Sequence, residues 1–194
     1  MRILLIYAHP SPQSYQSALH DTACRALRAA GHEVDDCDLY AEGFQPLLTR
    51  DELTHYHDAA QNRQMVAAHT DRLLHCQGLA FVYPTWWYGM PAMLKGYFDR
   101  VWVPGVAFDL VNGRTRPLLQ HITKFAVLTT YGSPWWYNRL ALGDPGRKMF
   151  MRGIASSVAP GAKKLWLAQY AMDRIDDAQR RRFLARVARR LSRF

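Results

Sequence analysis

Five short segments rich in strand-forming residues, separated by longer segments with helical periodicity, constrain this chain more than any other feature. They span residues 2–8, 32–39, 79–83, 124–130 and 163–169. The run at 2–8 is almost continuously apolar, as expected of a parallel strand whose two faces are both covered. Strands that alternate with helices form βαβ units with right-handed crossovers. The pattern therefore predicts an α/β fold, with a doubly wound five-stranded parallel sheet and helices on both faces.

The helices are expected between these strands and after the last of them. Their predicted ranges are 14–30, about 51–75 (with a break), 91–101, a stretch within 144–158, and about 176–192. Ser14 is a suitable N-cap for the first helix, and Gly31 is a suitable stop. Residues 103–118 contain Asn112-Gly113 and predict a loop with a short hairpin. The 194 residues, 49% of them hydrophobic, are enough for a single domain spanning 1–194.

The positive charge of the chain is concentrated at one end. The formal net charge is +9, and residues 174–194, with eight arginines and two aspartates, supply +6 of it. This distribution argues against a nucleic-acid-binding face spread over the fold. The last helix is expected to present a solvated basic face; contact with a membrane surface or an acidic partner, such as a transporter, is the alternative. No apolar run is long enough for a signal segment or membrane span, so a cytoplasmic protein is expected.

The three cysteines are Cys24, Cys37 and Cys76, and no CxxC motif is present. We expect reduced structural thiols and no metal site. His55 and His57 point apart at helical spacing and do not form a ligand pair.

Three segments, 9–17, 84–90 and 130–139, follow the carboxyl ends of predicted strands, where ligands bind in doubly wound sheets. The first combines the start of a helix with the hydroxyls of Ser11, Ser14 and Ser17, which suits a phosphate, and His9 can add a donor. It contains no GxGxxG and no Walker lysine. The alternative is that Ser14 only caps the helix and His9 is a solvated turn residue.

The second and third segments are rich in aromatic residues. Trp86-Trp87-Tyr88 and Trp135-Trp136-Tyr137 would be costly to expose without a reason. A flat aromatic ligand explains them by stacking, while a subunit interface or a packed surface lid are the alternatives. One ligand satisfies all three segments, because flavin mononucleotide (FMN), or the FMN half of FAD, has a phosphate end and a flat polar ring.

Residues 84–101 (PTWWYGMPAMLKGYFDRV) resemble the signature P-x-x-W-[FY]-x-x-P-A-x-L-K-x-[WY]-[FI]-[DE]-R-V of the NAD(P)H:quinone reductase family, which includes DT-diaphorase-like, modulator-of-drug-activity and potassium-efflux ancillary proteins. Residues 9–16 and 129–132 resemble its H-[PS]-x-x-x-S-[FY]-N and T-T-G-G segments. The resemblance covers roughly residues 3–140. It implies a flavodoxin-like fold.

The resemblance also implies roles for individual residues. The residues implied to hold the flavin phosphate or pyrophosphate, with the serine that the loop adds, are His9, Ser14, Tyr15, Gln16 and Ser17. Those implied to line the flavin ring are Pro84, Thr85, Trp86, Trp87 and Tyr88. Those at its pyrimidine side are Thr129, Thr130, Tyr131 and Gly132. Tyr137 matches a tyrosine that assists hydride transfer.

Three positions depart from the family pattern. Gln16 replaces an asparagine, and Tyr131 replaces a glycine. Leu142 precedes Gly143-Asp144 where the better-known members have a catalytic histidine.

The implied function is two-electron reduction of a quinone or similar acceptor by NAD(P)H, with a ping-pong mechanism and a homodimeric enzyme. The alternatives are a flavin-binding regulatory subunit of a membrane transporter and a one-electron flavodoxin-like carrier. The residues leave open the choice between FMN and FAD and the choice between NADH and NADPH.

Overall fold

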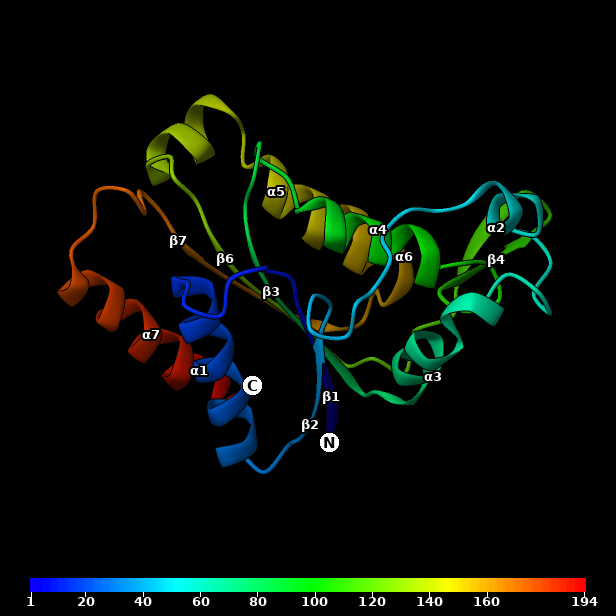
Figure 1. Cartoon of the computed structure of the whole chain (residues 1–194), viewed down its shortest axis with the longest axis horizontal. Coiled ribbons are helices and arrows are strands. Elements are labelled where there is room, and N and C mark those ends of the chain that lie inside the picture. Colours follow the sequence, from blue (N-terminus) through cyan, green and yellow to red (C-terminus); the bar gives the residue numbers. More distant parts are fainter.

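The computed structural model describes residues 1–194 and has a five-stranded parallel sheet at its centre (Figure 1). The strands stand in the spatial order β2-β1-β3-β6-β7, and every pair is parallel. Their bounds are β1 Arg2–Tyr7, β2 Glu33–Asp38, β3 Gly78–Pro84, β6 Lys124–Thr130 and β7 Lys163–Gln169. The strand order reverses between β1 and β3, which is the switch point of a flavodoxin-like doubly wound sheet. The predicted fold class is confirmed.

Helices cover both faces of this sheet. On one face, α1 (Tyr15–Ala29) packs beside α7 (Asp177–Leu191) (Figure 1). The opposite face carries α3 (Ala67–His75), α4 (Ala92–Val101) and a helical stretch made of α5 (Pro145–Lys148), the π-helical segment Met149–Ile154 and α6 (Ala155–Val158). Because successive strand residues point to opposite faces, Ile3 and Leu5 join the first hydrophobic layer, while Leu4 and Ile6 join the second.

The remaining elements lie in the connections. The predicted helix at 51–75 is broken, as expected, into α2 (Arg50–Thr54), the 3₁₀ turn Gln64–Val66 and α3. The predicted hairpin is present as β4 (Phe108–Val111) and β5 (Arg114–Pro117), with Asn112 and Gly113 both at positive φ in its turn. A π-helical turn, Tyr137–Ala141, follows β6.

Local signals set most helix ends where the sequence predicts them. The Ser14 side chain caps α1 by accepting a hydrogen bond from the amide of Ser17, and Gly31 follows this helix at φ 80°. The helix α4 begins at Ala92, one residue later than predicted, because Pro91 has an extended ψ of 151° and serves as the N-cap. None of the helices combines the length and apolar character needed to cross a bilayer.

Candidate active site

The loops that follow β1, β3 and β6 meet at the carboxyl edge of the sheet, because these strands are neighbours. Thr85, directly after β3, donates its amide to the carbonyl of Thr130 at 2.9 Å, and its hydroxyl lies 2.9 Å from that of Thr129. The rings of His9 and Trp86 lie 6.3 Å apart, which brings the first loop against the second. The three segments singled out from the sequence therefore border one region of the molecule.

The first loop is folded by its own hydrogen bonds. The amide of Ser11 donates to Nδ1 of His9 at 3.1 Å, and the hydroxyl of Ser14 donates to the carbonyl of Ser11 at 2.8 Å. Nδ1 of His9 also lies 3.2 Å from the carbonyl of Ser11, so whether Nδ1 donates or accepts depends on the tautomer of the imidazole. The start of α1 leaves the amides of Tyr15 and Gln16 without an acceptor inside the helix. These donors suit an anion at the loop.

Two predicted phosphate residues have distinct surroundings. The hydroxyl of Tyr15 donates to the carbonyl of Arg180 at 3.0 Å, so this side chain ties α1 to α7 and offers the loop only its amide. Burial raises the pKa of Tyr15 to about 12. Gln16 is 3% exposed, and both polar atoms of its side-chain amide lack a partner in the protein. Burying an amide group without hydrogen-bond partners costs free energy, so we expect a ligand group to hydrogen-bond with Gln16.

The second loop contains a tight turn in an unusual conformation. Trp86 and Gly89 exchange two backbone hydrogen bonds, at 3.1 and 3.0 Å, and the two residues between them, Trp87 and Tyr88, have φ angles of 50° and 60°. Side chains other than glycine rarely adopt this region, and it costs free energy where they do. The amides of Trp87 and Tyr88 have no acceptor in the protein, and the Trp87 side chain is 98% exposed.

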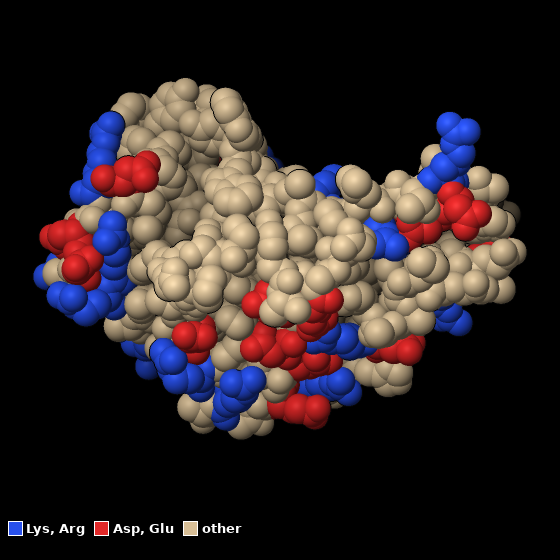
Figure 2. Space-filling model, viewed as in Figure 1, with Lys and Arg blue, Asp and Glu red and all other residues tan.

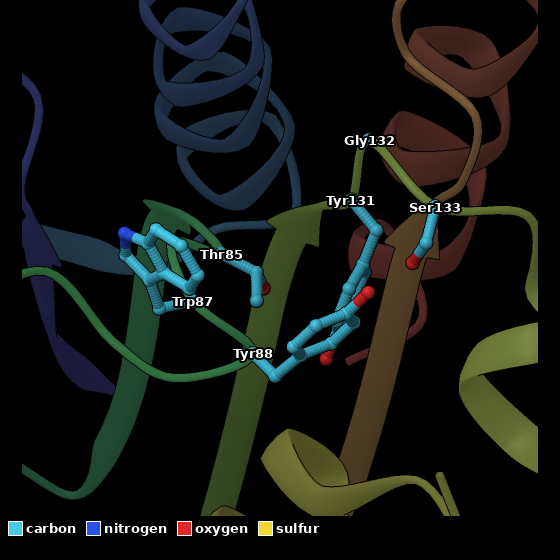
Figure 3. A pocket seen from close by; sticks show the side chains of 6 residues that line it. All are labelled: Thr85, Trp87, Tyr88, Tyr131, Gly132 and Ser133. Atoms are coloured by element: carbon cyan, nitrogen blue, oxygen red, sulfur yellow. The ribbon is translucent and has the colours of Figure 1, made fainter. Parts of the chain in front are cut away.

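A hollow of about 210 Å³ separates the second loop from the third. Figure 3 shows its lining, with Tyr88 and Tyr131 on one side of Thr85 and Trp87 on the other. The lining residues are Thr85, Trp87, Tyr88, Tyr131, Gly132 and Ser133. Five of the six are residues that the sequence assigns to the flavin ring, and Ser133 is the addition. No protein group accepts a hydrogen bond from the amides of Trp87, Tyr88, Gly132 or Ser133.

Tyr131 forms the floor of this hollow. It is 2% exposed, its ring stacks on that of Tyr170 at 5.1 Å, and its hydroxyl has no hydrogen-bond partner. Burial raises the pKa of Tyr131 far above the ordinary range of a phenol, so its hydroxyl stays neutral. A side chain on Gly146 would lie 2.7 Å from this hydroxyl, so the start of α5 packs directly against it. The tyrosine that replaces the family glycine is therefore turned down into the protein.

The other aromatic residues of the third loop stand in the open. Trp135, Trp136 and Tyr137 are 54%, 52% and 38% exposed, and the last two pack edge to face. Beneath them Asn138, fully buried, donates its amide to Asp144 at 3.1 Å and closes the loop. Asp144 itself has φ 59°.

Sequence reasoning missed Ser133, Asn138 and Asp144. Ser133 sits next to a predicted residue and has a buried hydroxyl without a partner. The Asn138–Asp144 pair has no local sequence signal, because it is made across six residues by an irregular turn. The surface around the carboxyl edge is mostly uncharged on the face shown in Figure 2, which suits a flat, largely apolar ligand.

Comparisons with known proteins agree with this fold. The family described as having the flavodoxin-like fold matches residues 1–152. The chain is 32% identical over 160 residues to the ribosyldihydronicotinamide dehydrogenase (quinone) of Pongo abelii, a match that covers 74% of this chain and 69% of that one. It is 30% identical over 153 residues to NAD(P)H dehydrogenase (quinone) 1 of Rattus norvegicus, covering 71% of this chain and 56% of that one. Among solved structures, the NAD(P)H:quinone oxidoreductase of Methanothermobacter marburgensis superimposes with a TM-score of 0.86 at 28% identity, covering 99% of this chain and 98% of that one.

Proposed function

The chain belongs to the flavodoxin-like fold family, and from this premise we propose that it is a flavin-dependent oxidoreductase that passes two electrons from NAD(P)H to a quinone or similar acceptor. One observation carries the proposal. Four backbone amides without an acceptor, at Trp87, Tyr88, Gly132 and Ser133, line an aromatic hollow beside a second group of anion-binding donors at the start of α1. The names of the relatives as quinone dehydrogenases support the same activity.

The residues present fit a flavin at both of its ends. At the phosphate end, the amides of Tyr15 and Gln16 and the buried side chain of Gln16 offer unsatisfied donors. At the ring end, Trp87 and Tyr88 supply aromatic faces, and the free amides supply hydrogen bonds to ring heteroatoms. Either FMN or the FMN half of FAD meets these requirements.

The chemistry that a bound flavin supplies is the acceptance of a hydride from a nicotinamide and its delivery to an acceptor as an electron pair. The protein residues would bind and orient the flavin and its substrates. The free amides of Gly132 and Ser133 would stabilise negative charge on the pyrimidine side of a bound flavin, because they are fixed donors that line the hollow. Tyr137 is 38% exposed in the third loop, and its hydroxyl would supply a proton donor if the loop brings it to the substrate. No histidine follows His121, so we assign no imidazole to this step.

We propose a ping-pong order. The nicotinamide and the acceptor would use the same exposed face of the flavin in turn, so the oxidised nicotinamide would leave before the acceptor enters. Initial rates measured at several acceptor concentrations should give parallel lines in double-reciprocal plots, whereas intersecting lines would contradict the shared pocket.

The decisive experiment is an absorbance spectrum of the purified protein, followed by anaerobic addition of NADH and then NADPH. A yellow protein whose flavin bands bleach on addition of either nucleotide supports the proposal, and the faster nucleotide identifies the donor. Cofactor released by heating and separated by chromatography distinguishes FMN from FAD. A protein that stays colourless after incubation with FMN and FAD would refute the proposal that this chain is a flavin-dependent enzyme.

The same titration separates the reductase from an electron carrier. A one-electron carrier accumulates a long-lived semiquinone during stepwise reduction with dithionite, whereas a two-electron reductase passes directly to the fully reduced flavin. We propose the second outcome, because flavodoxin-like carriers tend to be acidic and this chain carries +9.

An apolar groove supports the proposed homodimer. It runs between α4 and the 149–158 helical stretch, where an open hollow of about 360 Å³ is lined by residues that include Met90, Phe98, Trp102 and Ile154. An exposed apolar groove of this kind is typical of a subunit interface. Sedimentation at micromolar concentration should show a dimer, and Ile154→Arg should shift it to monomer; a monomeric wild-type protein would refute the interface.

The basic face of α7 supports contact with an anionic surface. Arg186 and Arg190 of this helix border a cleft together with Arg139, Arg147 and Lys164. We propose that these cations bind acidic phospholipids at the membrane surface. We also propose a cytoplasmic location, which the three free, buried cysteines support. Co-sedimentation with phosphatidylserine vesicles but not with phosphatidylcholine vesicles, lost in Arg186→Glu/Arg190→Glu, would support this; equal binding by the variant would refute it.

A further inference from the structure

A thiol, an imidazole and a carboxylate converge between α1 and β2, outside the residues assigned to the flavin. His20 and Cys24 stand four residues apart and so share one face of α1. Asp36 of β2 faces them. Nε2 of His20 lies 2.7 Å from Oδ1 of Asp36, and Sγ of Cys24 lies 3.5 Å from both Nε2 of His20 and Oδ2 of Asp36.

These separations match the ligand shell of a zinc ion. Zinc lies about 2.3 Å from sulfur and about 2.0 Å from nitrogen or oxygen, so a tetrahedral shell sets sulfur about 3.5 Å from each of the other two ligands. The separations of Sγ from Nε2 and from Oδ2 already have this value. A carboxylate fills one tetrahedral position with one oxygen, here Oδ2, so Asp36 must turn to open the 2.7 Å contact between its Oδ1 and Nε2 of His20. Its side chain is 35% exposed on an edge strand and has room to do so.

The imidazole is held in the orientation that such a site needs. The ring of Tyr7 stacks on that of His20 at 4.3 Å with an interplanar angle of 9°. Asp21 lies 3.9 Å from the other ring nitrogen, Nδ1, on the side where metal-binding histidines have a carboxylate partner. Nε2 is thereby left facing Cys24 and Asp36. Two of the three groups are buried, with Cys24 4% and His20 9% exposed.

The site can be reached from solvent. His20 lines a hollow of about 440 Å³ together with His9, Ser17 and Asp38, next to the start of α1. Cys24 and Asp36 do not line this hollow, and the partly exposed side chain of Asp36 offers the ion its entry.

We propose that His20, Cys24 and Asp36 bind a zinc ion, with water as the fourth ligand. A soft thiolate beside an imidazole selects zinc over magnesium and calcium, which take shells of oxygen ligands. The thiol gives its proton to solvent as the sulfur–zinc bond forms, so that thiolate, carboxylate and ion together are neutral. The ion clamps α1, which carries the proposed phosphate loop, onto β2. This inference does not depend on flavin binding.

A second group of the same composition provides a matched control. On the other face of β2, Sγ of Cys37 lies 3.7 Å from Glu42 and 3.8 Å from His69. There the guanidinium of Arg72 donates to both carboxylate oxygens of Glu42 at 2.8 Å. The positive charge of Arg72 on this carboxylate repels a zinc ion, so we expect no zinc at Cys37.

The test uses the untagged full chain and the metal alone. Titration with Co²⁺ should give one equivalent of a tetrahedral complex, with intense visible d–d bands and a near-ultraviolet thiolate-to-cobalt band. Zinc should then displace the cobalt and abolish both bands. Calorimetric titration with Zn²⁺ should give one site per chain and release of about one proton, measured from the dependence of the heat on the buffer.

Substitutions locate the ion. Cys24→Ser should abolish the thiolate band, and His20→Gln should weaken zinc binding by at least about 100-fold, because even groups behind the ligands change affinity by about 10- to 100-fold. Cys37→Ser should bind cobalt and zinc as the wild type does. Far-ultraviolet circular dichroism verifies that each variant is folded. If one of them is not, Asp36→Asn replaces it as the test of the ligand set. No thiolate band in the wild type, or a band that survives in Cys24→Ser and disappears in Cys37→Ser, overturns the proposal.

Discussion

Replacing Trp87 by glycine should make the protein more stable while weakening its hold on flavin. Trp87 has φ 50° in the turn of the second loop, and its side chain is 98% exposed. Its side chain therefore contributes almost no packing to the fold. What it does contribute is the steric cost of a left-handed conformation in a residue with a Cβ atom.

The effect on stability follows from two opposing terms. Removing the Cβ from a left-handed residue relieves about 1–2 kcal/mol. The greater freedom of glycine in the unfolded chain costs about 0.5–1 kcal/mol. The free energy of unfolding of Trp87→Gly should therefore rise, by up to about 1.5 kcal/mol. Trp87→Ala retains the Cβ and should leave it unchanged.

The effect on flavin binding is larger and has the opposite sign. If the ring covers half of the indole, about 100 Å² of apolar surface is buried, worth about 2–3 kcal/mol at the usual coefficient. Both Trp87→Gly and Trp87→Ala should thus raise the dissociation constant of flavin by roughly 30- to 150-fold. The alanine variant separates stacking from strain, because it loses only the stacking.

Urea unfolding of the flavin-free proteins measures the first quantity, and quenching of flavin fluorescence measures the second. A glycine variant less stable than the wild type would refute the argument from strain. An alanine variant that binds flavin as tightly as the wild type would refute the stacking role of Trp87. The two results are independent, so each part of the reasoning can fail alone.

Two further predictions concern the fold that supports the site. A Cβ added at Gly96 would lie 2.5 Å from the Cα of Pro46, a backbone atom, so Gly96→Ala should destabilise the protein by about 2 kcal/mol or more in urea unfolding; wild-type stability would show that the 43–49 segment can move away. Burial alone raises the pKa of Asp35, but hydrogen bonds from Arg72 and Arg2 outweigh it and lower the pKa below its ordinary value. The stabilisation from Asp35 is therefore present above its unfolded-state pKa of about 3.9 and is lost as the pH falls through the lowered folded-state pKa; Asp35→Asn should flatten the fall in unfolding free energy between pH 5 and pH 2, and an unchanged slope would contradict the assignment.

The strands and the meeting of the three loops could be predicted from the sequence, because both depend on local patterns. A parallel strand covered on both faces requires an apolar run such as 79–83, and the carboxyl ends of neighbouring strands must share an edge. That reasoning brought Thr85, Trp87, Tyr88, Tyr131 and Gly132 to one pocket. The predicted functions of these residues stay predictions until flavin binding is measured.

Features that depend on side-chain direction or on strand register could not be predicted from the sequence. The sequence placed Tyr131 in the third loop but could not say that its ring turns down onto Tyr170. The proposed metal site could not be predicted from the sequence, because its third ligand is Asp36. This carboxylate reaches His20 and Cys24 of α1 only because β2 lies beside β1. A single aspartate in a polar edge strand has no pattern that reveals its partner.

The strain in the backbone gathers where the ligand is proposed to bind. Five residues other than glycine have positive φ, and one of them, Asn112, belongs to a hairpin turn that requires it. The other four, Trp87, Tyr88, Asp144 and Ala171, all lie in segments that follow β3, β6 or β7 at the carboxyl edge of the sheet. Each costs about 1–2 kcal/mol, and nothing in the packing of the core demands them. Such residues persist only where the surrounding structure fixes them and where function retains them. The distribution of strain thus points to the same edge as the free amides and the exposed aromatic rings, and at Trp87 and Tyr88 one turn produces all three features.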